Sequence, residues 1–460
     1  MFQIDYNHPI PVHFIGIGGI SMSGLACILK KAGFTVTGSD GKASELTARL
    51  EAEGIPVAIG QRAENIPSPC SLVVYTAAVH EDNPEYQEAV RQGIPMLTRA
   101  QLLGELMRNY PVAAAVAGTH GKTTTTSMLA HICMEAGQDP TISVGGMLPL
   151  IGGNIRVGGP DTFITEACEY TNSFLSFYPT VGIVLNIDAD HLDFFKDLDD
   201  IRASFRKFME LIPADGAVVI NGSIPELAQL TDGLPCKVIT FGTPDSDYQA
   251  VNVSFEANGD TSFDLKKRQA TAVAERYTLR VPGEHNIANA LAAIAAADFM
   301  GAGTQAQKDG LYAFTGTGRR FEKKGMLGNV TVIDDYAHHP TEIRATLHSA
   351  ATQPHREVWC VFQSHTYSRT KALFNDFVDA LSLADHVVVA EIYPARETDT
   401  LGMSGELLCE ALKKHGCDAF FFPDFAQIEA FVRSHVRDND LLITMGAGDI
   451  YKVGDDLLRG

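Results

Sequence analysis

The sequence lacks the features that would place the protein in a membrane or outside the cell. Its longest nearly apolar run, residues 290–300, is short and contains Asp298, so it cannot cross a bilayer. No charged N-terminal region precedes an apolar stretch, and we expect no secretory signal. The eight cysteines are scattered and none forms a C-x-x-C pair, which argues against a disulfide framework or a zinc site. We therefore expect a cytoplasmic protein with reduced thiols.

Basic residues are also scarce. The chain has 36 lysines and arginines against 56 acidic residues, for a net charge of −20. Nucleic-acid binding usually requires a basic surface, so this balance argues against a nucleic-acid partner but still allows a local basic pocket for a small anion. The 460 residues suffice for about three domains of ordinary size.

What the sequence does contain is a recurring pattern: an apolar run, a glycine-rich or polar turn, and a helix-compatible stretch. The apolar runs are residues 12–17, 112–117 and 330–333. This alternation predicts parallel α/β architecture, with each turn beyond the carboxyl end of a strand, where such sheets bind ligands. We place domain boundaries near residues 110 and 318, which gives domains of residues 1–110, 111–318 and 319–460.

The first turn, G-I-G-G at residues 16–19, lets backbone amides approach a pyrophosphate at a helix N-terminus. Ser21 stands where the dinucleotide-binding fingerprint has its third glycine. A second predicted strand, residues 34–37, leads to Asp40, whose carboxylate can accept hydrogen bonds from a ribose or a base edge. By itself this segment fits an NAD-dependent dehydrogenase as well as a UDP-sugar-binding domain.

The second turn gives the strongest signal in the chain. G-T-H-G-K-T, residues 118–123, is a shorter variant of the phosphate-binding loop, because Val116 stands where the longer pattern has its first glycine. Backbone N–H groups of the loop can cradle phosphate oxygens, Lys122 can reach the β- and γ-phosphates, and the Thr123 hydroxyl can bind Mg²⁺. We assign the nucleotide phosphates to Gly118, Thr119, His120, Gly121, Lys122, Thr123 and Thr124. We expect a helix over residues 124–137, after the loop.

Two more polar segments follow predicted strands in the central region, T-E-A-C-E at residues 165–169 and N-I-D-A-D-H-L-D at residues 186–193. A carboxylate and an imidazole at adjacent strand ends suit a divalent cation shared with ATP. Farther along, Asn286 and Asn289 are three residues apart at a predicted helix start, so they share a face of that helix.

In the last third of the chain, polar residues follow several predicted strands. Arg319 and Arg320 stand beside flexible glycines, and arginine forks suit pyrophosphate or carboxylate. The segment D-D-Y-A-H-H-P-T-E, residues 334–342, follows one strand. Polar residues also follow the predicted strands at residues 358–362, 387–390 and 441–445. Four polar strand ends in one domain predict a binding edge.

Taken in order, these motifs resemble those of the muramyl ligases. The matching segments are G-I-G-G-x-x-M-S-G, V-A-G-T-H-G-K-T-T-T-T, D-H-L-D, P-G-x-H-N-x-x-N-A, G-x-x-R-R-F and D-D-Y-A-H-H-P-T-E. The resemblance covers roughly residues 10–450, and the R-R-F and D-D-Y-x-H-H-P-T-E segments are typical of the members that add L-alanine. A dehydrogenase would leave the phosphate loop unexplained, and a nucleotide switch would explain that loop alone.

The resemblance implies three α/β domains: an N-terminal Rossmann-like domain, a central P-loop ATPase-like parallel sheet, and a C-terminal Rossmann-like domain. It implies an ADP-forming ligase that uses ATP and Mg²⁺, with Mn²⁺ as the other candidate ion. Its implied substrates are L-alanine and the lactyl carboxylate of UDP-N-acetylmuramic acid, joined through an acyl phosphate in peptidoglycan precursor synthesis. The alternative is a recycling ligase that attaches a preformed peptide.

The resemblance also assigns residues to roles. The UDP portion falls to Gly18, Gly19, Ser21 and Asp40, with Arg319 or Arg320 facing its phosphates. The divalent cations fall to Thr123, Glu169 and His191. The ATP adenine and ribose fall to His285, Asn286, Asn289 and Asp335. The amino acid and the muramyl carboxylate fall to Tyr336, His339 and Arg369, with His339 as the candidate to assist deprotonation of the amine.

The chain departs from the family pattern at three places. Cys168 precedes Glu169 where such ligases commonly have a second acid, so only Glu169 keeps the Mg²⁺ role. Gln61 stands where a histidine often contacts the nucleotide. Sister ligases carry a carbamoylated lysine near the position of Ser204 or Phe205 here, so we predict no such modification.

Overall fold

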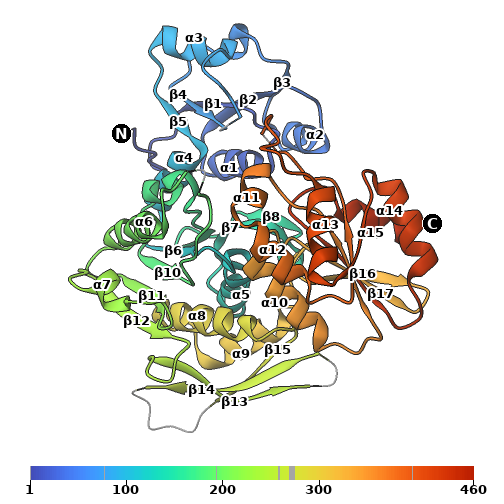
Figure 1. Cartoon of the computed structure of the whole chain (residues 1–460). Coiled ribbons are helices and arrows are strands. Elements are labelled where there is room, and N and C mark those ends of the chain that lie inside the picture. The colour runs from blue at the N-terminus through green and yellow to red at the C-terminus, as the bar shows by residue number, and fades with distance from the viewer. Residues whose placement is uncertain are drawn as a thin grey trace. The chain divides into compact units, whose positions relative to one another are not determined.

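The computed structural model describes residues 2–76, 78–192, 194–256, 259–268, 275–395 and 397–459. The chain is built from three sheets flanked by helices (Figure 1). It divides into two compact units: unit 1 comprises Met1–Ile187, Asp199–Gln249 and Leu291–Gly310, and unit 2 comprises Asp188–Leu198, Ala250–Ala290 and Leu311–Gly460. Within the described ranges, no helix is both long and apolar enough to cross a membrane.

The N-terminal sheet, in unit 1, has five parallel strands. In spatial order they are β3 (Val57–Ile59), β2 (Thr35–Asp40), β1 (Pro11–Ile15), β4 (Leu72–Tyr75) and β5 (Met96–Thr98). The accompanying helices are α1 (Ile20–Lys31), α2 (Glu45–Ala52), η1 (Ala63–Asn65), α3 (Pro84–Gln92) and α4 (Arg99–Met107). Because β1 lies between β2 and β4, the glycine turn that follows it opens beside the ends of both neighbours.

The central sheet has ten strands and is mixed. In spatial order they are β15 (Glu275–Leu279), β14 (Thr261–Lys267), β13 (Tyr248–Phe255), β12 (Lys237–Phe241), β11 (Ala217–Asn221), β10 (Val181–Val184), β6 (Val112–Ala117), β9 (Thr162–Glu166), β7 (Thr141–Leu148) and β8 (Gly153–Arg156). The accompanying helices are α5 (Lys122–Glu135), η2 (Pro149–Ile151), η3 (Tyr170–Ser176), α6 (Leu198–Glu210), α7 (Leu227–Thr231), α8 (His285–Phe299) and α9 (Thr304–Ala313). β6 pairs in parallel with β9 and β10, so the phosphate loop emerges between two parallel neighbours.

The C-terminal sheet, in unit 2, has six strands. In spatial order they are β16 (Glu322–Leu327), β17 (Val330–Asp335), β21 (Leu441–Met445), β18 (Val358–Phe362), β19 (His386–Val389) and β20 (Asp418–Phe421). The accompanying helices are α10 (Pro340–Ala351), α11 (Tyr367–Ala372), α12 (Phe374–Leu381), α13 (Gly405–His415), α14 (Phe425–His435) and α15 (Tyr451–Arg459). All neighbours are parallel except β16 and β17.

Burial on both faces explains the apolar runs of this sheet. Along β18, Cys360 and Phe362 pack into a core with residues of α10, α12 and α13. The alternate residues Trp359 and Val361 pack into a second core with residues of α14 and α15. Successive side chains of a strand point to opposite faces, so a strand covered on both faces is apolar throughout.

The three-domain α/β architecture expected from the sequence is confirmed. Three strands, β6, β18 and β21, have the bounds predicted from their apolar runs, whereas β17 extends through Asp335 and α5 begins at Lys122 rather than at residue 124. The sequence reasoning did not foresee the antiparallel pairs β7–β8, β14–β15 and β16–β17, because it followed only strand–turn–helix alternation.

Within unit 1, α4 packs against η3 at a contact that only glycine allows. A Cβ atom on Gly104 would lie 1.9 Å from the carbonyl oxygen of Ser176 and 3.2 Å from the Cα of Phe177. Both are backbone atoms, which cannot move aside as the end of a flexible side chain can. The contact thus joins a helix of the N-terminal sheet to a segment that follows β9 of the central sheet.

We expect Gly104→Ala to lower the thermal unfolding midpoint. Alanine favours a helix over glycine by about 1 kcal/mol, but overpacking against backbone costs about 1–3 kcal/mol, and this contact belongs at the upper end. The control is Gly153→Ala, because a Cβ there meets no atom of the described residues within 4 Å. An equal midpoint for Gly104→Ala and wild type in scanning calorimetry would contradict the prediction.

Candidate active site

The glycine turn after β1 is fixed by backbone bonds from the end of β2. The carbonyl oxygen of Ser39 accepts hydrogen bonds from the N–H groups of Gly16 and Ile17, both at 2.9 Å. The Asp40 carboxylate accepts one from the N–H of Gly18, also at 2.9 Å. A Cβ at position 18 would lie 2.8 Å from an Asp40 carboxylate oxygen, so a larger residue there would displace that side chain. Asp40 therefore braces the turn.

Two polar contacts flank this turn. Arg99, at the start of α4, donates from its guanidinium to the Ser21 hydroxyl at 3.2 Å, which brings a cation beside the first turn of α1. The sequence reasoning missed Arg99, since 78 positions separate it from Ser21. On the other side, the Asn83 side-chain amide donates to the Gln61 carbonyl oxygen, so Gln61 is held in a defined position.

The phosphate loop between β6 and α5 takes its shape from two glycines and one asparagine. Gly118 and Gly121 have φ angles of +144° and +83°, which side chains disfavour. Asn186, after β10, accepts from the Thr119 N–H through its backbone carbonyl at 3.2 Å and from the His120 N–H through its side chain at 2.8 Å. It also donates from its side-chain amide to the carbonyl of His120 at 3.0 Å. Asn186, which the sequence reasoning gave no role, is thus the brace of this loop.

Lys122 lies at the start of α5 with its ammonium directed back into the loop. It donates to the carbonyl oxygens of Gly118 and, at 3.0 Å, of Thr119, and it forms an ion pair with Glu169 at 3.0 Å. Burial would lower the pKa of Lys122, but the Glu169 carboxylate outweighs it and holds that pKa above its ordinary value. Lys122 is therefore charged at neutral pH, and the buried Thr123 hydroxyl follows it in the first turn of the helix.

In unit 2, the D-H-L-D segment begins with an ion pair of the buried Asp190. Asp190 accepts from the guanidinium of Arg369 at 3.1 Å, and His191 Nε2 lies 3.8 Å from the same carboxylate. Burial would raise the pKa of Asp190, but the charge of Arg369 outweighs burial and lowers that pKa below its ordinary value. Asp193, the last residue of the motif, lies outside the described residues.

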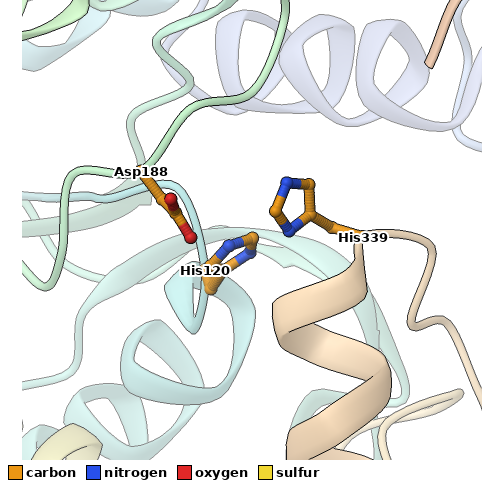
Figure 2. Close-up of side chains that lie close together, drawn as sticks. All are labelled: His120, Asp188 and His339. Atoms are coloured by element: carbon orange, nitrogen blue, oxygen red, sulfur yellow. The ribbon is translucent and has the colours of Figure 1, made fainter. Parts of the chain in front are cut away.

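His339 caps α10 with both ring nitrogens engaged. Its Nδ1 accepts from the Thr341 N–H at 3.3 Å, so its Nε2 carries the proton and donates to the carbonyl oxygen of Ala189, also at 3.3 Å. Asp188 lies beside it, with a carboxylate oxygen within 4.8 Å of an imidazole nitrogen (Figure 2), and accepts from the Thr341 hydroxyl at 3.0 Å. Figure 2 also labels His120, which belongs to the phosphate loop of unit 1.

The two asparagines at the start of α8 face each other, as their spacing predicted. The Asn289 amide donates to the Asn286 side-chain oxygen at 3.1 Å, and the Asn286 amide donates to the carbonyl of Pro282 at 2.6 Å. Both side chains are buried. Burial also lowers the pKa of the adjacent His285, which favours its neutral form.

Arg319 is held by groups of the C-terminal domain itself. Its guanidinium forms an ion pair with Asp334 at 2.8 Å, donates to the carbonyl of Gly446 at 2.7 Å, and lies over the rings of Tyr336 and Tyr451. These contacts cross-link the ends of β17 and β21. The Arg319 guanidinium is therefore engaged within the domain, and its contacts stabilise the domain.

Arg320 is held less tightly than Arg319, whereas Asp335 is buried and hydrogen-bonded. Arg320 lies 4.0 Å from Glu342, at the limit of an ion pair, with a third of its side chain exposed. Asp335 is buried and accepts from the N–H groups of Phe321 and Ala337 at 2.8 and 2.7 Å. Burial, opposed by the charge of Arg320, raises the pKa of Asp335 to about 6.

The geometry thus brings the predicted residues together in groups within each unit. Unit 1 holds the glycine turn, the phosphate loop and Glu169, and unit 2 holds His191, the adenine-contact candidates and the polar strand ends of the C-terminal domain. Each group contains a cationic side chain, which suits an anionic ligand. Unit 1 contributes the partly buried Lys122 and unit 2 the partly buried Arg369.

Comparison with known proteins gives these groups a context. The chain is 56% identical to a UDP-N-acetylmuramate–L-alanine ligase of Lachnospira eligens and 53% identical to one of Agathobacter rectalis, in both cases over 100% of each chain. Among solved structures, it is similar to the UDP-N-acetylmuramate–alanine ligase of Thermotoga maritima, with a TM-score of 0.80, 32% identity and 98% of both chains covered. It is also similar to a murein peptide ligase of Psychrobacter arcticus, with a TM-score of 0.70, 25% identity and the same coverage.

Three family models match consecutive parts of the sequence. The Mur ligase family catalytic domain matches residues 11–111, the Mur ligase middle domain residues 116–297, and the Mur ligase glutamate ligase domain residues 319–448. Together they span the glycine turn, the phosphate loop and the polar strand ends of the C-terminal sheet. The chain belongs to the Mur ligase family.

Proposed function

We propose that this chain joins L-alanine to the lactyl carboxylate of UDP-N-acetylmuramate, with ATP as phosphoryl donor, in the synthesis of peptidoglycan precursors. Relatives that share more than half of its residues over their full length are named for that reaction. The peptide-adding alternative has less support, because eight curated relatives at 47–56% identity are named for alanine addition, whereas the solved peptide ligases of Psychrobacter arcticus and Neisseria meningitides share 25% and 33% of its residues.

The observation that carries the proposal is the phosphate loop with its partly buried Lys122–Glu169 pair. Backbone N–H groups at the start of α5 and one charged lysine form a site for the phosphates of ATP. We assign the triphosphate to this loop, and the adenine to His285, Asn286 and Asn289 at the start of α8. We assign the ribose of ATP to Asp335.

We further propose that each of three domains binds a different substrate. Residues 1–110 bind the UDP-sugar at Gly18, Gly19, Ser21 and Asp40, residues 111–318 bind ATP, and residues 319–460 bind the amino acid and close over ATP. Of the two arginines proposed for the phosphates of the UDP-sugar, we favour Arg320, because Arg319 is held by Asp334. We place the reaction in the cytoplasm and assign it no nucleic-acid partner.

The groups beside the phosphate loop suit Mg²⁺. The Thr123 hydroxyl and the Glu169 carboxylate offer hard oxygen ligands, which that ion prefers. In unit 2, His191 offers an imidazole, which binds a softer ion such as Mn²⁺ better. An ion held by Thr123 and Glu169 would supply positive charge to the phosphate oxygens of ATP.

The reaction needs activation because a carboxylate is a poor electrophile. An oxygen of the lactyl carboxylate attacks the γ-phosphorus of ATP, ADP leaves, and an acyl phosphate forms. The amine of L-alanine then attacks the carbonyl carbon and phosphate leaves. The first step brings two anions together, so the charge of Lys122 lowers its barrier by offsetting their repulsion.

The amino acid falls to Tyr336, His339 and Arg369 of unit 2. Arg369 is fixed by Asp190, which accepts from its Nε and Nη2, and its Nη1 donates to the carbonyl of His365 at 3.4 Å. We assign its charge to a substrate carboxylate. His339 is our candidate to take a proton from the amine. Because its Nδ1 lone pair accepts the Thr341 N–H, it must give up that bond first.

The test of the function is phosphate release by the whole chain. We expect release to require ATP and UDP-N-acetylmuramate, and to accelerate when L-alanine is added. Glycine and L-serine serve as parallel acceptors, and a peptide that begins with L-alanine tests the recycling alternative. ATP hydrolysis that UDP-N-acetylmuramate does not change would indicate a nucleotide switch, and faster release with the peptide than with free alanine would indicate the recycling ligase.

We expect Lys122→Ala to reduce the turnover number by at least ~10²-fold, since the loss of one preorganised charge at such a site typically costs that much. The control is Lys31→Ala, which removes an exposed lysine of the same unit whose ammonium bonds to the carbonyl of Val157. Thermal unfolding of both variants should accompany the rates, because Glu169 loses its counter-charge in the first. Turnover close to wild type in folded Lys122→Ala would refute the phosphate-loop assignment.

Asp335 gives a pH-dependent prediction. Its pKa is about 6 in the folded chain against an ordinary 3.8, so ionisation costs the folded state more than the unfolded state. Its contribution to stability is therefore complete below pH 4 and is lost as pH rises through 6, by about 3 kcal/mol for a shift of about two units. As pH rises from 4 to 7, we expect the unfolding midpoint of Asp335→Asn to rise relative to that of wild type, because the asparagine does not ionise. A difference between the two unfolding midpoints that stays constant across this range would contradict the raised pKa of Asp335.

A further inference from the structure

The N-terminal domain contains a buried carboxylate that none of the proposed roles uses. Glu85, in the first turn of α3, is 0% exposed. One of its oxygens accepts from His13 Nε2 at 3.1 Å and from the Ser39 hydroxyl at 2.6 Å. The other accepts from the backbone N–H of Arg62 at 3.2 Å and from the Asn65 amide at 2.6 Å. Both oxygens are thus fully used.

This saturation keeps a charge in the interior of the sheet. Burial would raise the pKa of Glu85, but the hydrogen bonds from His13, Ser39 and Asn65 outweigh it and lower that pKa. A buried charge is tolerated only where such bonds replace water. An ionised acceptor also makes each of its hydrogen bonds stronger and more directional than a neutral one.

The first pair of bonds leads to the glycine turn. Ser39, which the carboxylate holds by its hydroxyl, uses its own carbonyl to accept from the N–H groups of Gly16 and Ile17. The next residue, Asp40, accepts from the N–H of Gly18. The position of the end of β2, and with it the shape of the turn, therefore depends on what anchors Ser39.

The second pair of bonds leads to the segment between β3 and η1. Besides its bond to the buried carboxylate, Asn65 donates to the carbonyl of Gly60 at 2.8 Å, and the N–H of Gly60 donates to the carbonyl of Asp40 at 2.8 Å. Gln61 is held from the same helix start, because Asn83, which caps α3, donates to its side chain. One helix N-terminus thus fixes both the glycine turn and the segment opposite it.

We propose that Glu85 is a positioning residue for the nucleotide-sugar: it holds residues 16–19 and residues 60–65 in the spacing that binds the UDP portion. The inference rests on the proposed placement of that portion at the glycine turn. Glu85 does not touch the ligand, and it acts through Ser39 on one side and through Arg62 and Asn65 on the other.

The test compares the KM values of the whole enzyme. We expect Glu85→Ala and Ser39→Ala each to raise the KM for UDP-N-acetylmuramate, by about 10-fold for the former, as is usual when a residue that orients a binding group is removed. The KM for ATP and the turnover number should stay within twofold of wild type. The double variant should be no worse than Glu85→Ala alone, because the effect of Ser39 passes through that carboxylate.

The matched control is Glu105→Ala. Glu105, on α4 in the same unit, is also 0% exposed, and it accepts from the backbone N–H of Ile4. Its loss should lower the unfolding midpoint without a selective change in the KM for the UDP-sugar. If Glu85→Ala fails to fold, Ser39→Ala decides the question, since it removes a single bond of the set.

Asp40→Ala separates the two ways in which the proposal can fail. If it raises the KM for the UDP-sugar while Glu85→Ala and Ser39→Ala do not, the site is placed correctly and the positioning role is wrong. If none of the three changes that KM, the placement of the UDP portion is wrong as well. If Glu85→Ala and Glu105→Ala both raise the KM values for UDP-N-acetylmuramate and for ATP to the same extent, Glu85 only stabilises the domain and the positioning role is wrong.

Discussion

The ion pair between Lys122 and Glu169 is the interaction on which the phosphate loop depends. Both side chains are largely removed from water, and either one alone would be costly to bury. Together they keep the ammonium protonated and directed back across the loop. Asn186 then fixes the backbone around that charge, so the amides and the lysine form one preorganised anion site.

Much of the fold could be predicted because the sheets are covered on both faces. A strand such as β18 is apolar throughout and ends at polar residues, so its bounds can be read from the chain. The start of α5 was placed two residues late, because Lys122 belongs to the loop motif and to the helix at once. The antiparallel pairs escaped prediction, since each contains a strand, β8, β15 or β16, that is partly exposed and carries no continuous apolar run.

The site was predictable only where its residues are close in sequence. The phosphate loop and the pair Asn286–Asn289 are local motifs, whose geometry follows from helix spacing and glycine conformation. Arg99 and Glu85 act through contacts with residues 78 and 46 positions away, which no local pattern encodes. Likewise, nothing in the R-R-F motif indicates that Arg319 pairs with Asp334 while its neighbour does not, because that depends on how the ends of β17 and β21 meet.

The order of strands in the C-terminal sheet has a consequence for synthesis on the ribosome. β21 lies between β17 and β18 in the sheet, yet its first residue, 441, follows their last residues, 335 and 362, by 106 and 79 positions. Until residues 441–445 emerge, the inner edges of β17 and β18 have no partner between them, and their apolar faces cannot close into the two cores. This domain therefore assembles late in translation, and a nascent chain that stalls before β21 would expose edges prone to aggregation.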